Sequence, residues 1–303
     1  MSLEGPKFLV SIIINNYNYE HFLREALDSA LNQTYPHIEV IVVDDGSTDN
    51  SREIIASYGE RIVPILKENG GQASAFNAGF VASRGDIICI LDSDDIFLPE
   101  KVAEIVKVFD YHQDIGWCFH RLKFVDANTG AFIKLSAESR TRKCDFRTHL
   151  KRGKLPFNCP ATSSLCFTHS LLQQILPMPE ASGVTISDHY LKITALALSK
   201  GFFLDEQLAI LRVHGANRYT YSDKINNKLQ AKILILTAYW LRANWPFLTK
   251  FGNKLFAKGI GTYWKVGDRE AEYIEKVKIY LSAVSPLEKM EIGLRALYYR
   301  WKL

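Results

Sequence analysis

The chain has 303 residues, 47% of them hydrophobic and 23% charged, an ordinary composition for a soluble globular protein with a sizeable core. Its five cysteines are odd in number and form no CxxC pair, which disfavours a disulfide framework and a zinc site. Residues 1–220 carry 22 basic and 26 acidic side chains, which argues against a nucleic-acid partner, whereas residues 221–303 carry 15 basic and 7 acidic ones, net +8.

No segment has the pattern of a membrane span or of a secretory leader. The longest uncharged apolar run, Ile233 to Leu241, has about half the length that crosses a bilayer. The opening "MSLEGPKFLV" has neither a basic start nor a long apolar stretch. With cysteines that we expect to be reduced, these features predict a cytoplasmic protein. The basic C-terminal part leaves open a peripheral contact with the inner face of the membrane.

The first 110 residues alternate strand and helix patterns in chain order. Short apolar runs predict four strands, at Phe8–Ile14, Ile38–Asp45, Arg61–Lys67 and Asp86–Asp92. Each strand is followed by apolar residues at helical spacing. Pro64 weakens the third strand, which we therefore place at an edge, and Pro99 is expected in the first turn of the fourth helix. Such repeats predict a Rossmann-like α/β fold, with a mostly parallel central sheet and helices on both faces.

Residues 115–215 have a less regular pattern. We expect one helix from about Ser187 to Lys200, and short strands at Gly116–His120, Leu122–Val125, Ser163–Phe167 and Phe203–Arg212. From about residue 216 the pattern is helical. The sequence therefore predicts an α/β domain over residues 1–215 and a helical C-terminal extension over residues 216–303.

The last predicted helix is amphipathic. It opens with "SPLE" (Ser285 to Glu288), which has the pattern of a capping box. Its apolar side chains recur at steps of three and four residues, at Leu287, Met290, Leu294, Leu297 and Trp301. This stripe has two interpretations: it lies on a membrane surface, or it packs on the first domain or on a second subunit as in a homodimer. Packing is the more common role of such stripes, so we expect it here.

Three carboxylates follow the fourth strand in "DIICILDSDDIFL", namely Asp92, Asp94 and Asp95. Because side chains alternate along a strand, we expect Asp92 and Asp94 to share one face and Asp95, a structural residue, to point the other way. Two such charges about 4 Å apart at a half-buried site repel by roughly 4 kcal/mol. A Mg²⁺ or Mn²⁺ ion would relieve this repulsion and allow a diphosphate to bind. The alternative is that these aspartates only cap the next helix.

Other phosphate-binding motifs are absent from the sequence. Neither GxxxxGK[ST] nor a GxGxxG after the first strand is present, which argues against a P-loop NTPase and a dinucleotide oxidoreductase. A nucleotidyltransferase would be expected to have a Gly-rich basic loop after the first strand, which is also missing.

Two long blocks resemble the nucleotide-sugar domain of family 2 glycosyltransferases: "VSIIINNYNYEHFLREALDSALNQTYPHIEVIVVDDGSTDNS" and "NGGQASAFNAGFVASRGDIICILDSDD". The match is ordered over about the first 110 residues and sparser to about residue 218. The resemblance implies a GT-A fold and an inverting, Mn²⁺- or Mg²⁺-dependent transfer from a nucleotide sugar, preferably a UDP-sugar. The acceptor would be a hydroxyl of a glycan or lipid-linked molecule in polysaccharide or glycoconjugate biosynthesis.

The resemblance also implies roles for particular residues. Five are expected to bind the nucleotide: Asn15, Tyr17 and Asp45 at the base, Asp92 near the ribose, and Gln72. Asp94 is expected to bind the metal, with His214 of "LRVHGANR" as a further metal or phosphate contact. Asp188 in "TISDHYLK" stands where the family carries the base that deprotonates the acceptor. A lone aspartate at a helix start is more often a cap, so this role depends on the resemblance.

The sequence departs from the family pattern at three places. Asn15 and Asn16 stand where many relatives have Pro-Thr, Phe76 where many have Arg, and Ser187 where the residue before the base is usually Glu. The alternative interpretation is a non-catalytic relative that binds a nucleotide or a glycan.

Overall fold

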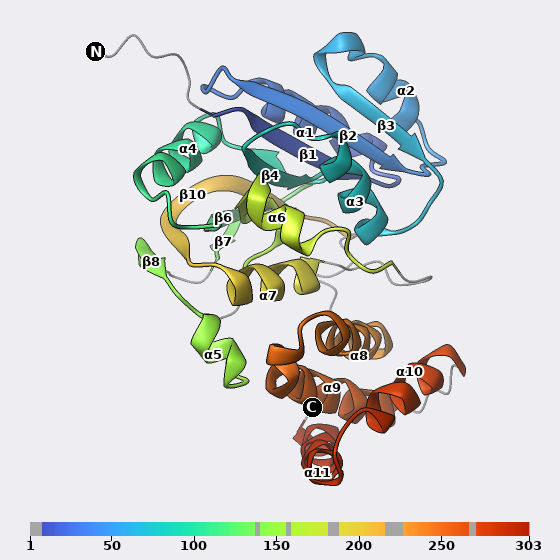
Figure 1. The fold of residues 1–303 in the computed structure, drawn as a ribbon. Helices are drawn as coiled ribbons and strands as arrows, with labels where there is room; N and C mark the ends of the chain where they lie inside the picture. The colour runs from blue at the N-terminus through green and yellow to red at the C-terminus, as the bar shows by residue number, and fades with distance from the viewer. Residues whose placement is uncertain are drawn as a thin grey trace. The chain divides into compact units, whose positions relative to one another are not determined.

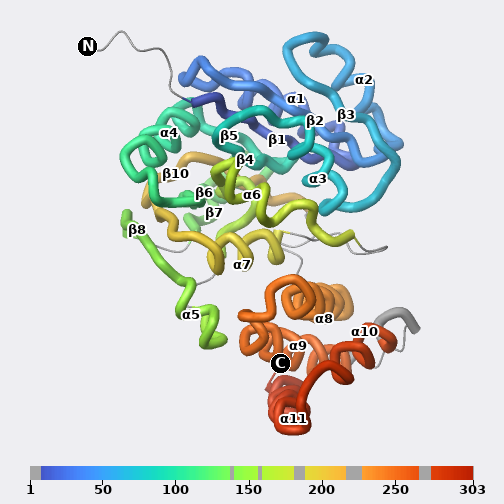
Figure 2. The backbone as a smooth tube through the Cα atoms, in the orientation of Figure 1, coloured from blue at the N-terminus to red at the C-terminus, as the bar shows by residue number. Residues whose placement is uncertain are grey.

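The structure is a computed structural model that describes residues 8–136, 140–155, 159–180, 188–215, 227–266 and 271–302. The chain forms two compact units. The first comprises Met1–Asp145, Asn158–Asp188 and Leu198–Tyr221, and the second Phe146–Phe157, His189–Ala197 and Ser222–Leu303. Figure 2 follows the backbone through both.

The first unit is built on a ten-stranded sheet with the order β3-β2-β1-β4-β9-β6-β10-β5, to which β7 and β8 add through β6 and β10. One half is parallel and confirms the four predicted strands: β1 (Val10–Asn16), β2 (Ile38–Asp45), β3 (Val63–Lys67) and β4 (Ile87–Asp92). Strand β3 ends this strand order, as the proline at position 64 predicted.

The other half of the sheet mixes directions. Its strands are β5 (Ile96–Phe97), β6 (Trp117–Asp126), β7 (Phe132–Leu135), β8 (Arg142–Cys144), β9 (Leu165–Thr168) and β10 (Gly201–Val213). Strand β9 is antiparallel to both of its neighbours, β4 and β6, whereas β6 and β10 are parallel. The two short strands expected at 116–125 are one strand, because the polar pair His120 and Arg121 interrupts the apolar run without ending the ladder.

Helices cover both faces of the parallel strands, as expected (Figure 1). On one face, α1 (Glu20–Leu31), α2 (Ser51–Ala56) and α4 (Lys101–Tyr111) pack on a core that includes Ile12 and Val42. On the other, α3 (Gln72–Ala82) packs so closely that a Cβ atom on Gly79 would lie 2.5 Å from the side chain of Ile13. Pro99 was wrongly placed inside the fourth helix: α4 begins at Lys101, after a turn that a Lys101 N–H to Leu98 O bond closes.

Three further helices follow in the chain: α5 (Arg147–Lys151), α6 (His169–Ile175) and α7 (Asp188–Leu198). Helix α6 lies beside α3, since the rings of Phe80 and His169 are 4.7 Å apart. Helix α7 confirms the helix expected over 187–200, although Ser187 itself lies outside the described residues.

Four helices form most of the second unit: α8 (Asn227–Asn244), α9 (Thr249–Val266), α10 (Ala271–Ser282) and α11 (Pro286–Lys302). Their core includes Ile235, Phe256 and Tyr280, and the last two rings stack at 3.9 Å. The capping box of α11 is confirmed, because Ser285 N–H donates to Glu288 and Glu288 N–H to Ser285 Oγ. Within the described ranges, no helix combines the length and hydropathy that a bilayer crossing requires.

Candidate active site

Three carboxylates meet at the carboxyl end of β4. Asp92, Asp94 and Asp95 each offer an oxygen atom, and these atoms lie within 4.8 Å of one another. The expected opposite orientation of Asp95 is therefore wrong. Strand β4 ends at Asp92, and a turn with an Asp95 N–H to Asp92 O bond of 3.0 Å brings Asp95 back. The alternation of a strand does not extend into a turn.

Asp95 is held by protein donors, which agrees with the structural role assigned to it. Its carboxylate accepts bonds from Ser163 Oγ at 2.6 Å and from Arg212 N–H at 3.1 Å. Burial, together with the charges of Asp94 and Asp92, raises the pKa of the Asp95 carboxyl well above its usual range. The cluster therefore favours a proton or a cation at this position.

Ser163, in the short 3₁₀ helix η2 (Thr162–Ser164), connects several parts of the cluster. Its hydroxyl donates to Asp95 and accepts from the N–H of Asp92 at 3.1 Å. Its carbonyl accepts from Lys101 Nζ at 3.2 Å. Lys101 is fully buried, and its ammonium lies 3.1 Å from the centre of the Phe97 ring. The contacts of Ser163 and Lys101 could not be predicted from the sequence, because they join residues more than 60 positions apart.

Replacing Ser163 with alanine is expected to lower the free energy of unfolding by about 1.5–3 kcal/mol, because a buried carboxylate oxygen and a buried N–H lose their partner. Ser164 is a matched control. It is equally buried, but its hydroxyl donates only to the Ala161 carbonyl at 3.0 Å, so Ser164→Ala should cost about 0.5–1.5 kcal/mol. Urea denaturation measures both; equal losses would contradict the role of Ser163.

Residues at and just after the end of β10 also contact the carboxylate cluster. The Arg212 guanidinium donates to the Asp94 carbonyl and forms an ion pair with Glu25 at 2.9 Å. Two residues further, His214 Nε2 lies 3.1 Å from Asp94 Oδ2, and the imidazole stacks on the Phe22 ring at 4.4 Å. Asp94, the expected metal ligand, and His214, the expected metal or phosphate contact, are thus neighbours, and their binding of a metal stays a prediction. Arg212 was missed as a separate residue, although "LRVHGANR" contains it.

Asn15 lies directly beside the cluster. In the parallel ladder it is the partner of Asp92, and its carbonyl accepts from the N–H of Ser93 at 3.3 Å. Both polar atoms of its side chain are buried, and neither has a hydrogen-bond partner among the described residues. Buried amides are normally paired, so this side chain is suited to a ligand. Tyr17 follows two residues later and is half-buried.

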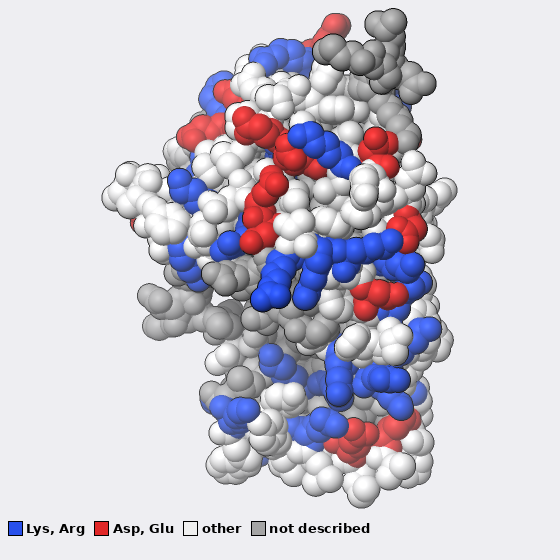
Figure 3. Space-filling view, turned by 90° about the vertical axis from the view of Figure 1, so that its left-hand side faces the viewer, with Lys and Arg blue, Asp and Glu red and all other residues white. Residues whose placement is uncertain are grey.

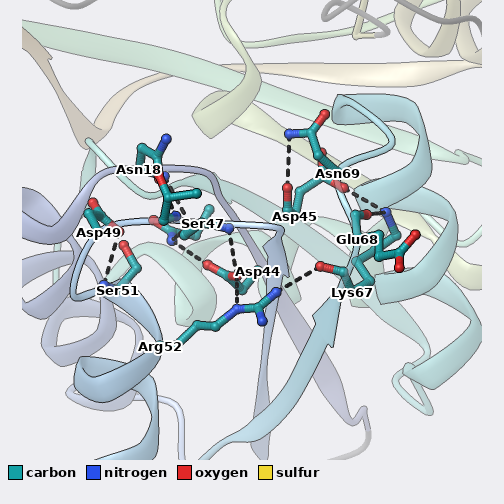
Figure 4. Close-up of polar contacts among 12 residues, drawn as sticks. Asn18, Asp44, Asp45, Ser47, Asp49, Ser51, Arg52, Lys67, Glu68 and Asn69 are labelled. Carbon is teal, nitrogen blue, oxygen red and sulfur yellow. Dashed lines mark hydrogen bonds and ion pairs between the residues drawn. The ribbon is translucent and has the colours of Figure 1, made fainter.

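The two aspartates that end β2 have different surroundings (Figure 4). Burial alone would raise the pKa of Asp44, but bonds from Ser47, Arg52 and Asn16 outweigh it and hold that pKa below its usual value. Asp45, the predicted base contact, accepts from Lys67 Nζ at 2.6 Å.

The backbone N–H groups of Gly70 and Gly71 also donate to Asp45, at 2.9 and 2.7 Å. A carboxylate has about four acceptor positions, so one remains for a base N–H group. Gln72 follows immediately as the first residue of α3 and is half-buried.

Asp188 contacts the 3₁₀ helix η2, which also contacts the carboxylate cluster. It begins α7, and Thr162 Oγ1 lies 3.5 Å from its Oδ2 atom. The neighbouring Ser163 bonds Asp95, so one short turn joins Asp188 to the carboxylates of β4.

The donor set suits a hard divalent cation. Carboxylate oxygens are the ligands that Mg²⁺ and Mn²⁺ prefer. Asp92 and Asp94 supply them, with His214 Nε2 beside Asp94. Asp95 is the poorest candidate ligand, because both of its oxygens already accept protein hydrogen bonds.

Comparison with known sequences agrees with this architecture. The family model "Glycosyl transferase family 2" matches residues 11–170. A protein of Nostoc sp. described as an uncharacterized glycosyltransferase is 34% identical over 227 residues, which cover 74% of this chain and 70% of that protein. One of Rickettsia typhi with the same description is 35% identical over 211 residues, 69% of this chain and 65% of that protein. The chain thus spans only about two thirds of these relatives.

Solved structures share the fold. S. aureus TarS residues 1–349, in complex with UDP-GlcNAc, superpose with a TM-score of 0.64 at 19% identity over 96% of this chain and 87% of that chain. The mannosyltransferase PcManGT from Pyrobaculum calidifontis, in complex with GDP-Man and Mn²⁺, gives a TM-score of 0.53 at 18% identity, covering 97% and 87%. With its matched family model and its α/β architecture, the chain belongs to the family 2 glycosyltransferases and has the GT-A fold.

Proposed function

We propose that this protein is a metal-dependent, inverting glycosyltransferase that moves a sugar from a UDP-sugar to the hydroxyl of a glycan or lipid-linked acceptor. The observation that carries this proposal is the meeting of Asp92, Asp94 and His214 at the carboxyl end of β4, with Asp188 joined to it through one turn. In open α/β sheets, ligands bind at the carboxyl ends of parallel strands.

Each residue has a proposed part in the donor site. Asn15, Tyr17, Asp45 and Gln72 bind the nucleotide, with Asp92 near the ribose. Asp94 and His214 hold Mn²⁺ or Mg²⁺, which when bound neutralises charge on the departing diphosphate. The unpartnered amide of Asn15 beside Asp92 supports this assignment.

Asp188 is the proposed base. Its carboxylate accepts the proton of the acceptor hydroxyl while that oxygen forms a bond to the anomeric carbon. The bond from the same carbon to the diphosphate oxygen breaks on the opposite side, so configuration inverts. The position of Asp188 at the start of α7, in contact with the 3₁₀ turn that also bonds Asp95, fits this role.

A thermal-shift experiment tests the donor site. UDP and GDP, each with and without Mn²⁺, are compared on the full chain. We expect UDP to raise the melting temperature only when the cation is present, and GDP to raise it less. The nucleotide pair is informative because the two structural neighbours hold UDP-GlcNAc and GDP-Man. Stabilisation that is independent of the cation would contradict the proposal.

A further inference from the structure

The last helix, α11, has an apolar face that is exposed in the described part of the chain. Six large side chains on it are 46% to 82% exposed: Leu287 70%, Met290 59%, Leu294 63%, Leu297 46%, Tyr298 53% and Trp301 82%. At about 100° per residue they fall within one arc of roughly 100°. We call these six side chains the outer stripe. A different face, with Ile292 and Ala296, is the buried one.

The expectation that this stripe packs on the first domain or on a second subunit stays a prediction, but within the second unit the stripe is not the face that packs. The helix does contact α9, but through its other face, where a Cβ atom on Gly261 would lie 2.5 Å from the Ala296 carbonyl. The sequence could not distinguish the faces, because the small Ala296 and the single Ile292 give a weaker periodic signal than the leucines. Six exposed large apolar residues in a continuous row indicate an interaction surface.

Most of the charges beside the outer stripe are basic. Lys289, Arg300 and Lys302 are exposed, and within the described residues none of them forms an ion pair. Both acidic groups of the helix have partners: Glu291 pairs with Arg295 of the same helix at 2.8 Å, and Glu288 accepts from Asn253 at 2.9 Å.

Aromatic and basic groups also gather at the carboxyl end of the helix. The Arg300 guanidinium lies 5.8 Å from the Trp301 ring centre, and Lys302 Nζ lies 5.2 Å from that of Tyr298. Basic side chains also recur on the visible face of the C-terminal helices (Figure 3). Residues 221–303 together carry a net charge of +8.

We propose that the outer stripe of α11 docks on an anionic phospholipid surface. Leucines on one face, tryptophan and tyrosine at one end and lysine and arginine along the edges are the features of a helix lying in the membrane interface. An anionic leaflet attracts such cations near its surface. Docking needs no helix that spans the bilayer, and it is independent of the proposed transfer reaction.

A second copy of the chain fits this surface less well. Residues 221–303 carry a net charge of +8, so two copies of this basic unit would repel each other. The charge pattern therefore favours an anionic surface over self-association.

Flotation of the full chain with vesicles tests the proposal. One set contains only phosphatidylcholine, and the other also contains phosphatidylglycerol. We expect flotation with the anionic vesicles and release as salt is raised. The double variant Leu294→Gln, Leu297→Gln should reduce the partition coefficient at least about tenfold, because two partly inserted side chains lose their apolar burial.

A matched pair of aromatic variants distinguishes vesicle binding through α11 from nonspecific binding through any exposed aromatic side chain. Trp301 is 82% exposed on α11, and Tyr111 is 83% exposed on α4. Trp301→Ala should weaken vesicle binding and Tyr111→Ala should leave it unchanged, while thermal melting is the same in both. Absence of flotation, or equal loss in both variants, would overturn the proposal. So would a dimer, detected by light scattering, that dissociates in the double variant of the stripe while vesicles remain unbound.

Discussion

Asp94→Asn is expected to abolish the Mn²⁺-dependent stabilisation by UDP and to reduce sugar transfer at least about 100-fold. Asparagine keeps the shape of the side chain but removes the charge that faces His214 and completes the cluster with Asp92. A neutral amide oxygen is a weaker ligand for a hard cation. Melting curves with UDP, with Mn²⁺ and with both, followed by transfer assays, measure the two effects.

Asp205→Asn provides the control. Asp205 is a partly exposed carboxylate whose ion pair is with Arg121 at 3.2 Å, and it is not part of the candidate site. That variant should keep both the cation-dependent shift and the transfer rate. If Asp94→Asn retained the shift, the carboxylates of β4 would not be the metal site, and the proposed function would lose its main support.

Asp188→Asn is expected to lower kcat by about 10²–10⁴-fold while UDP and Mn²⁺ still raise the melting temperature. A general base typically contributes a factor of this size, and the nucleotide site does not need it. The experiment follows transfer to an acceptor and hydrolysis of the nucleotide sugar, with the thermal shift as a binding measurement that does not depend on turnover.

Thr162→Val is the companion variant. It removes only the hydroxyl that lies 3.5 Å from Asp188, so its effect on kcat should stay below about tenfold. Loss of UDP binding in Asp188→Asn would make Asp188 a binding residue. A wild-type protein that binds UDP but neither transfers nor hydrolyses any nucleotide sugar would support the alternative of a non-catalytic relative.

The sequence predicted the parallel half of the sheet well, because its signals are local. Strand β2, for example, is an apolar run, interrupted by Glu39, that ends in two aspartates, and the structure begins and ends it at the predicted residues, Ile38 and Asp45. Each of these strands precedes a helix, so short-range periodicity was sufficient to establish the order of the elements.

The rest depends on contacts that periodicity does not encode. Strand β9 has four residues, Leu165–Thr168, and its place beside β4 follows from pairing across almost 80 residues. The position of the Asp95 carboxylate near that of Asp92 depends on β4 ending at Asp92. The bonds of Ser163 depend on η2 lying against the end of β4. Nonlocal geometry therefore decided the details of the candidate site.

The place of β9 has a consequence for the order in which the protein folds. Because β9 lies between β4 and β6, a nascent chain that has emerged only as far as Asp95 has an open edge at β4. Such an edge is a template for unwanted strand pairing. At that stage the aspartates also lack Ser163, Arg212 and His214. The complete site therefore forms only after most of the chain has been synthesised. A fragment that ends near residue 115 should aggregate rather than bind nucleotide.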